Sequence, residues 1–256
     1  MAPDSTPQHA FITGGGSGIG LACATRFLED GARVTIMGRN HDKLIAAQQS
    51  LSSLGEVDVV AGDVANEDDV RSAVETAHAH LPLTIAIANA GVGTAAPVTA
   101  MDQRAWNEVL EVNLTGTFHT FKHAGLAISA AGGGAMCAVS SIAGIRSHRL
   151  MSAYCSSKAG IDMLVQVTAD EMGARNVRVN SVRPGLVETE ISAQLRNSDA
   201  ILGDYLDCMP IQRVGTVEDV AGAIHFLCGP EATWITGVNL SVDGGHHLRR
   251  GPNLQA

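Results

Sequence analysis

Short apolar runs alternate with longer amphipathic stretches along almost the whole chain. The run at 135–139 has no polar alternation, which is typical of a strand covered on both faces of a parallel sheet. The pattern predicts strands at 9–13, 33–38, 58–64, 83–91, 134–141, 177–185 and 238–245. It predicts helices at 18–29, 40–54, 66–80, 101–130, 152–174 and 216–228. The alternation therefore indicates an α/β fold, a doubly wound parallel sheet with helices on both faces.

No linker, repeat or low-complexity segment divides the 256 residues, so we expect one domain over 1–256. Residues 1–8 are expected to form a flexible tail, and 246–256 a C-terminal tail. Residues 190–209 break the alternation after the sixth predicted strand. Because an irregular insertion at a strand's carboxyl end is where a lid covers a ligand, 188–210 are predicted to form a substrate lid.

Composition and charge exclude several classes of partner. The chain has 17 lysines and arginines against 26 aspartates and glutamates, a formal net charge of −9. Its only basic run is Arg249 and Arg250, so we expect no nucleic-acid partner. No apolar run approaches the roughly 18 residues of a membrane-spanning helix. The polar N-terminus does not resemble a secretion signal, and we expect a cytoplasmic protein.

The sequence predicts no metal site. Five cysteines lie far apart, without the spacing of zinc ligands or of a disulfide framework, and are expected to be reduced: Cys23, Cys137, Cys155, Cys208 and Cys228. His119 and His123 are four residues apart in a predicted helix, but no third ligand accompanies them. A structural or surface role is the simpler interpretation of this pair.

A glycine-rich turn, TGGGSGIG at 13–20, joins the first predicted strand to the first helix. Glycines allow the backbone to approach a pyrophosphate, whose charge is attracted by the N–H groups and the positive dipole end of the helix. An ordinary tight turn remains an alternative. The predicted phosphate-binding residues are Gly14, Gly16, Ser17, Gly18, Ile19 and Gly20.

The residues after the second predicted strand bear on the choice of cofactor. Dinucleotide folds commonly hold the adenosine ribose with a carboxylate at this place. Here Gly38 is followed by Arg39 and Asn40, and the Arg39 guanidinium can pair with a 2′-phosphate. The sequence therefore favours NADP, with NAD as the alternative. The other interpretation of Arg39 is a solvated surface charge.

At this point the chain resembles the short-chain dehydrogenase/reductase family, of the compact single-domain type. The motifs that carry the resemblance are Thr13-Gly-x-x-x-Gly18-x-Gly20, Asp63-Val64, Asn89-Ala90-Gly91, Asn113, Ser141, Tyr154-x-x-x-Lys158, Pro184-Gly185 and Thr189. Tyr154 follows Ser141 by 13 residues, the family's separation, which selects Ser141 over Ser140. The resemblance implies a Rossmann-type sheet of about seven strands, with the cofactor at the topological switch point.

A proton-handling group is predicted at the start of the helix at 152–174. Tyr154 and Lys158 are four residues apart, so their phenol and ammonium share one helix face. A free phenol titrates near about 10, and the ammonium, with a positively charged nicotinamide ring, is expected to lower the pKa of Tyr154. Tyr154 is predicted to act as general acid or base, and Ser141 to donate to the substrate oxygen.

The resemblance implies further roles. Lys158 is expected to hold the nicotinamide ribose, and Asn113 to support a water that links Lys158 to solvent. Asp63 and Val64 are expected against the adenine, although Asp63 fits equally as the cap of the helix that begins near Asn66.

Two more segments complete the predicted cofactor site. The small residues at the end of the fourth predicted strand either let the adenosine half of the cofactor pass close by or form a plain turn. These residues are Asn89, Ala90 and Gly91. A segment after the sixth strand resembles the one that binds the nicotinamide carboxamide: Pro184, Gly185, Val187 and Thr189.

The substrate end is predicted less sharply. Apolar residues near the lid either line the pocket or are plain packing positions: Met151, Ile191, Leu195, Ile201, Leu202, Tyr205, Leu206 and Met209. His246 and His247 are expected to form a solvated tail with Arg249 and Arg250. The alternatives are that these residues contact the substrate or a neighbouring subunit.

The resemblance implies an oxidoreductase that moves a hydride between NADP(H) and a carbonyl or secondary alcohol of a small apolar substrate. A 3-oxoacyl thioester carried by acyl carrier protein or CoA is an alternative, placed lower because 125–135 contain no basic residue. A non-catalytic NAD(P)-sensing protein is an alternative of another class, and a sugar-nucleotide epimerase is disfavoured by the short C-terminal region. Family habit predicts a homo-oligomer, a dimer or tetramer.

Overall fold

The computed structural model describes residues 8–248, which contain one seven-stranded sheet with every neighbouring pair parallel. The strands are β1 (His9–Thr13), β2 (Arg33–Gly38), β3 (Val57–Ala61), β4 (Ile85–Ala88), β5 (Gly134–Val139), β6 (Val177–Pro184) and β7 (Asn239–Val242). Their order in the sheet is β3-β2-β1-β4-β5-β6-β7. The chain therefore reverses its direction of winding between β1 and β4, the switch point at which such sheets bind ligands.

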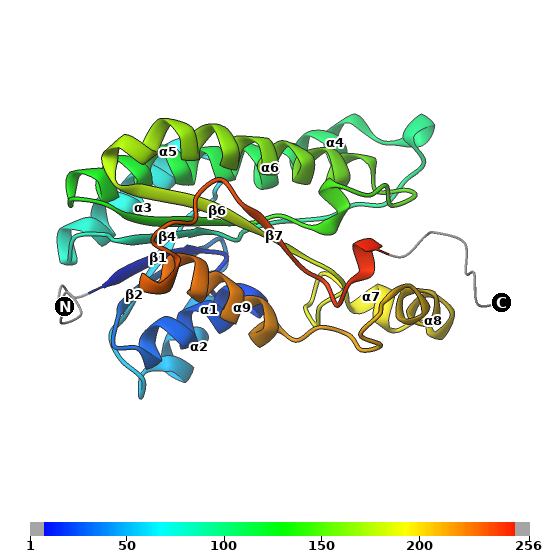
Figure 1. The fold of residues 1–256 in the computed structure, drawn as a ribbon, viewed down its shortest axis with the longest axis horizontal. Coiled ribbons are helices and arrows are strands. Elements are labelled where there is room, and N and C mark those ends of the chain that lie inside the picture. Colours follow the sequence, from blue (N-terminus) through cyan, green and yellow to red (C-terminus); the bar gives the residue numbers. More distant parts are fainter. Residues whose placement is uncertain (1–7, 249–256) are drawn as a thin grey trace.

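Helices cover both faces of the sheet, in two layers (Figure 1). One layer holds α1 (Gly18–Glu29), α2 (His41–Leu51) and α9 (Val217–Cys228); the other holds α3 (Glu67–His80), α4 (Gln103–Leu110), α5 (Gly116–Ala130) and α6 (Ser152–Met172). Two short helices, α7 (Ala193–Arg196) and α8 (Asp199–Cys208), lie beyond one end of the sheet. No helix within 8–248 combines the length and apolar character that a bilayer crossing requires.

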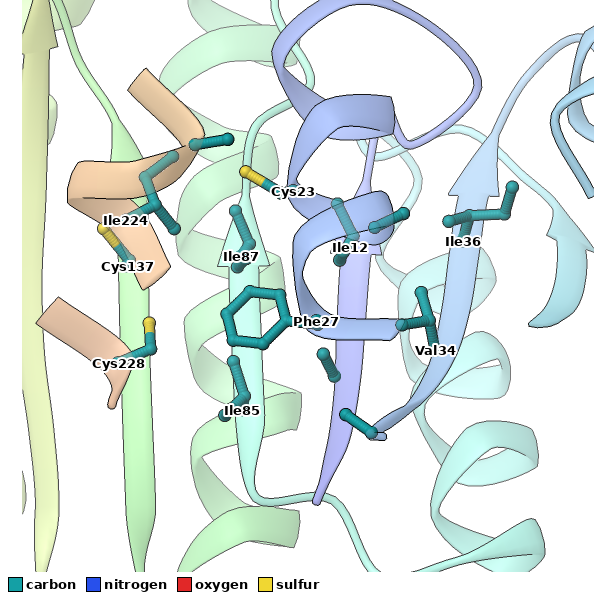
Figure 2. Close-up of a cluster of buried hydrophobic side chains, with 14 of the residues drawn as sticks. Ile12, Cys23, Phe27, Val34, Ile36, Ile85, Ile87, Cys137, Ile224 and Cys228 are labelled. Carbon is teal, nitrogen blue, oxygen red and sulfur yellow. The ribbon is translucent and has the colours of Figure 1, made fainter. Parts of the chain in front are cut away.

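The strands that adjoin the switch point are buried on both faces. All residues of β1 and β4 are buried, which explains why their sequences show no polar alternation. On the α1 side, Phe27 packs among isoleucines and valines of β1, β2 and β4 (Figure 2). Cys137 and Cys228 lie in the same cluster, where they behave as small apolar side chains. This packing fixes the carboxyl ends of the central strands relative to α1.

The predicted α/β fold with about seven strands is confirmed, with corrections to several element bounds. The third strand ends at Ala61 and the fourth at Ala88, so both are shorter than predicted. The helix predicted at 101–130 is interrupted by a π-turn at Glu111–Thr115, where the Gly116 N–H donates to the Glu111 carbonyl. Residues 190–209, which break the predicted alternation, contain α7 and α8.

A strained residue precedes the first turn of α6. Leu150 has φ of 70°, in the left-handed region that branched and bulky side chains rarely adopt. Its carbonyl accepts a hydrogen bond from the Ala96 N–H at 2.8 Å, which ties the segment after β4 to the start of α6. The Leu150 side chain is 52% exposed, so its packing contributes little in return for the strain.

We expect Leu150→Gly to raise the free energy of unfolding by about 0.5–1 kcal/mol. Glycine adopts the left-handed conformation without the steric cost that leucine has there. The greater conformational entropy of glycine in the unfolded chain offsets only part of this stabilisation. Urea unfolding at pH 7 measures the change. Asn176→Gly is the matched control, since Asn176 also has positive φ (58°) but asparagine tolerates this conformation, and its effect should be smaller. Equal effects of the two variants would contradict the strain at Leu150.

Candidate active site

A cavity of about 660 Å³ lies at the carboxyl ends of the strands. It is lined by the segments that follow β1, β2, β4 and β5, by the end of β6, by the start of α6 and by part of the lid segment, residues 188–210. The predicted site residues that line it are Gly14, Gly16, Ser17, Gly18, Ile19, Arg39, Asn40, Asn89, Ala90, Gly91, Ser141, Tyr154, Lys158, Pro184, Gly185 and Thr189. The fold thus brings the two predicted groups, cofactor-binding and catalytic, into one cavity.

The glycine turn needs glycine for conformation and for space. Gly14 and Gly18 have φ of 65° and 54°, and a Cβ on Gly20 would lie 2.3 Å from the Gly14 carbonyl oxygen. The Asn89 amide donates to the carbonyls of Thr13 at 3.0 Å and Gly14 at 3.1 Å. Asn89 therefore braces the turn against the end of β4, a role that its sequence position did not reveal.

The N-terminus of α1 faces this cavity. Ser17 is the N-cap, its side chain makes no capping hydrogen bond, and the first turn of α1 contains no acidic residue. The first N–H groups of a helix have no partner within it, and its dipole end is positive. Together with the close-packed glycines, this arrangement fits the pyrophosphate of a dinucleotide.

Two cations lie at the end of the cavity next to β2. The Arg39 side chain is 59% exposed, and its guanidinium is 4.0 Å from the Asp63 carboxylate. Asn40 accepts a hydrogen bond from the Lys43 N–H at 3.0 Å and so caps α2. Sequence reasoning missed Lys43, which also lines the cavity. Lys43 reaches the cavity through the packing of α2, so its place in the sequence gave no local signal.

Lys158 carries a buried charge beside Tyr154. Its side chain is 3% exposed, its ammonium donates to the Val139 carbonyl at 2.8 Å, and Nζ lies 5.4 Å from the centre of the Tyr154 ring. Burial lowers the pKa of Lys158 from 10.5 to about 8, against an opposing effect of the Asp162 carboxylate. The ammonium is thus still the major form at pH 7.

The pKa of Tyr154 was predicted to be lowered by the Lys158 ammonium together with a nicotinamide ring, and the protein's groups alone do not produce this lowering. Burial raises the pKa of the phenol above its ordinary value, and a hydrogen bond with the Ser141 side chain opposes this rise without cancelling it. The reason is geometric: the Lys158 ammonium is directed to the Val139 carbonyl, and the phenol lies in a partly desolvated position.

The two neighbouring serines are distinguished by their contacts. The Ser140 hydroxyl is buried and donates to the Lys158 backbone carbonyl at 3.1 Å, so it serves a structural contact. The Ser141 oxygen accepts from the Ala143 N–H at 3.1 Å, and its side chain also hydrogen-bonds with the Tyr154 phenol. These contacts agree with the choice of Ser141 for the candidate site.

Asn113 lies in the π-turn and is fully buried. Its amide oxygen accepts from the Val92 N–H at 2.8 Å, and its amide nitrogen donates to the Val92 carbonyl and the Ser157 hydroxyl, both at 3.0 Å. The side chain therefore joins the segment after β4 to α6 behind the cavity wall. This bracing is an observed role, separate from the predicted support of a water.

Five predicted site residues do not line the cavity: Gly20, Asp63, Val64, Asn113 and Val187. Asp63 and Val64 follow β3 by more than one residue, because that strand ends at Ala61. Asn66, not Asp63, caps α3, and Asp63 accepts from the Ala65 N–H at 3.0 Å. Val64 is buried, and its carbonyl accepts from the His119 ring.

The substrate end of the cavity is mostly apolar. Of the predicted lid and loop residues, the cavity is lined by Met151, Ile191, Leu195 and Tyr205, and not by Ile201, Leu202, Leu206 and Met209. His148 also lines it, although the sequence did not single it out.

The interpretation of His246 and His247 as a solvated tail is wrong. His246 is 5% exposed and packs edge-on against Tyr205, with ring centres 5.3 Å apart. The His247 ring contacts the Asp243 carboxylate at 2.8 Å. Arg249 and Arg250 lie outside the described residues.

Comparisons with known proteins agree with this geometry. A family model described as enoyl-(acyl carrier protein) reductase matches residues 14–247. Galactitol 2-dehydrogenase (L-tagatose-forming) of Cereibacter sphaeroides is 34% identical over 239 residues, 93% of this chain and 94% of that protein. A solved short-chain type dehydrogenase/reductase from Mycobacterium ulcerans has a TM-score of 0.93 and 40% identity, covering 98% of this chain and 93% of the other. A 7α-hydroxysteroid dehydrogenase in complex with NADH and 7-oxo glycochenodeoxycholic acid has a TM-score of 0.90 and 30% identity over 94% of each chain.

We expect Lys158→Met to raise the free energy of unfolding at pH 7 by about 1–2 kcal/mol. The lowered pKa of Lys158 corresponds to a cost of roughly 3 kcal/mol for keeping the charged ammonium in the folded state, which the variant removes. The variant also loses the hydrogen bond to the Val139 carbonyl, which offsets about 1 kcal/mol of this gain. Between pH 8 and the unfolded-state pKa near about 10.4, the unfolded wild-type chain binds more protons than the folded one. Wild-type stability therefore rises with pH in that window, and the advantage of the variant disappears above it.

Urea unfolding at pH 7 and pH 10 measures this advantage. Lys122→Met, at an exposed lysine that pairs with Glu67, controls for the loss of one positive charge. A Lys158→Met protein less stable than the wild type at pH 7 would show that the buried charge is not a net cost.

Proposed function

The chain belongs to the short-chain dehydrogenase/reductase family, and we propose that this oxidoreductase uses NADP(H) to interconvert a carbonyl and a secondary alcohol on a small apolar substrate. The observation that carries the proposal is the convergence of Ser141, Tyr154 and Lys158 on the cavity that also holds the glycine turn. A bound nicotinamide cofactor supplies or accepts the hydride. The protein's residues bind, orient and transfer the proton.

Several segments are proposed to hold the cofactor. The glycine turn and the N-terminus of α1 take the pyrophosphate, and Lys158 the nicotinamide ribose. The carboxamide is assigned to the segment with Pro184, Gly185, Val187 and Thr189. The adenosine half passes Asn89, Ala90 and Gly91, with Asp63 and Val64 near the adenine.

NADP is proposed over NAD because Arg39 lines the end of the cavity beside β2, where no carboxylate immediately follows the strand. A guanidinium can pair with the 2′-phosphate that distinguishes NADP. The 7α-hydroxysteroid dehydrogenase was solved with NADH, so relatives of this fold also use the other cofactor.

Tyr154 is proposed as the general acid in carbonyl reduction and the general base in the reverse direction. Its raised pKa keeps the phenol protonated at neutral pH, which suits proton donation to the substrate oxygen. The Lys158 ammonium favours the phenolate that remains, and Ser141 is proposed to donate a hydrogen bond to the substrate oxygen as charge develops there. Asn113 is proposed to support the water that returns a proton through Lys158.

The proposed substrate is a free small molecule with an apolar body. Among the described residues, the lysines and arginines that line the cavity are Arg39, Lys43 and Lys158, all assigned to cofactor or catalysis. None of these three cations is left to bind a substrate anion inside the cavity. The family model's description names an acyl carrier, so the acyl thioester remains the alternative. The similarity to enzymes of galactitol and of an oxo bile acid supports a hydroxyl or ketone substrate.

We propose a cytoplasmic homo-oligomer, a dimer or tetramer. Large apolar side chains are exposed on α5 and α6 at Phe118, Leu126, Met163 and Val167, and near β7 at Phe226, Trp234, Val238 and Leu240. Trp234 is 99% exposed, which is unusual for a tryptophan on a free surface. Two separate apolar faces support assembly through both.

We expect Tyr154→Phe to lower kcat/KM for ketone reduction by about 10²–10⁴-fold, because it removes the proton donor and little volume. A panel of ketones with NADPH measures the rates, and NADPH fluorescence titration checks that cofactor binding persists. Undiminished hydride transfer in the variant would contradict the acid–base role. If the wild type binds NADPH but turns over no ketone of the panel, the non-catalytic NAD(P)-sensing alternative is favoured instead.

We expect Arg39→Ala to raise the KM for NADPH by about 10–100-fold while leaving that for NADH nearly unchanged, since a charged hydrogen bond to phosphate is lost. Steady-state kinetics with both cofactors and one ketone measure the effect. Arg26→Ala, at an exposed arginine paired with Glu29 outside the cavity lining, is the control. An equal loss with both cofactors would contradict recognition of the 2′-phosphate.

A further inference from the structure

An ion pair joins α2 to the lid segment across the cavity. The Lys43 ammonium lies 2.8 Å and 3.0 Å from the two carboxylate oxygens of Glu190, although the residues are 147 positions apart in the chain. Lys43 is in the first turn of α2, whereas Glu190 follows the end of β6. Both residues line the cavity. The pair therefore links the two sides of one opening.

Both ends of this pair are held by local structure. On one side, the Lys43 N–H donates to the Asn40 cap. On the other, the Ser192 hydroxyl donates to the Val187 carbonyl and accepts from the Thr189 N–H at 3.2 Å, so residues 187–192 form a tied turn. Because Glu190 sits within this turn, the ion pair connects two ordered elements.

The pair crosses the cavity beside the glycine turn. A Cβ on Gly16 would lie 3.6 Å from the Lys43 carbonyl oxygen, and a Cβ on Gly18 would lie 3.5 Å from the Thr189 methyl group. Thus α2 contacts one end of the glycine turn, and the lid segment contacts the other. The ion pair spans the stretch that the proposed function assigns to the cofactor pyrophosphate.

We propose that Lys43 and Glu190 form a clasp that closes over the bound dinucleotide and slows its release. The clasp rests on the proposed cofactor binding in this cavity. Its side chains are 51% and 69% exposed, so water and salt screen the attraction. Such a pair breaks readily and changes the rate of cofactor release only severalfold. This is what a lid requires if it must open each time the cofactor is exchanged.

The test measures cofactor release directly, without a substrate. The enzyme is loaded with NADPH or NADH, excess oxidised cofactor displaces it, and the loss of nicotinamide fluorescence gives the dissociation rate. We expect Lys43→Met and Glu190→Gln each to speed release of both cofactors about two- to fivefold, the range for one exposed ion pair. The double variant should release no faster than the faster single variant, because both changes remove one interaction.

The pair of Lys122 and Glu67, on α5 and α3, provides matched controls outside the cavity lining. Lys122→Met and Glu67→Gln should leave release unchanged. The clasp is overturned if Glu190→Gln has no effect, if the two effects add, or if Lys43→Met speeds release of NADPH alone, which would make Lys43 a 2′-phosphate contact. If wild-type protein gives no fluorescence change with either cofactor, the proposed function fails instead.

Discussion

Lys158 carries its ammonium into the interior, where one backbone carbonyl, that of Val139, accepts from it at 2.8 Å. Much of the surrounding structure is arranged by this contact. The carbonyl belongs to the last residue of β5, and the next residue, Ser140, returns a hydrogen bond to the Lys158 carbonyl. A Cβ on Gly91 would lie 3.7 Å from Nζ and 3.3 Å from the Asn113 amide oxygen, so the segment after β4 passes close to the charge. The ends of β4 and β5 and the first turns of α6 are therefore fixed around one desolvated ammonium.

The π-turn gives the second constraint on α6. An inserted residue re-aims side chains within a helix and is frequent at functional sites. Here Asn113 faces Val92 and Ser157 with three hydrogen bonds, and the Ser157 hydroxyl donates to the Tyr154 carbonyl at 2.8 Å. One buried amide thus connects the segment after β4 to the backbone of Tyr154. This chain of bonds holds the backbone of the first turns of α6, which carry the phenol.

Sequence reasoning worked best where the signal is local. The bounds of β1, β2 and α1 agree with the predicted ranges, because apolar period and glycine placement are properties of a few adjacent residues. The π-turn within 101–130 was missed, since one inserted residue hardly alters a 3.6-residue period. The pair of Lys43 and Glu190 was missed because it joins distant segments. The upward pKa shift of Tyr154 within the protein was not predicted because burial is a tertiary property that local residue spacing does not show.

Burial acts in opposite directions on the two neighbouring groups. It raises the pKa of the Tyr154 phenol and lowers that of the Lys158 ammonium to about 8, although their unperturbed values, about 10 and 10.4, are close. Lys158 therefore releases its proton before Tyr154 as pH rises. At neutral pH the phenol holds its proton and the ammonium is mostly charged, which is the state from which a carbonyl oxygen is protonated. In the proposed mechanism, the protonated phenol is the donor for carbonyl reduction, and it must lose its proton before it can act as the base in alcohol oxidation.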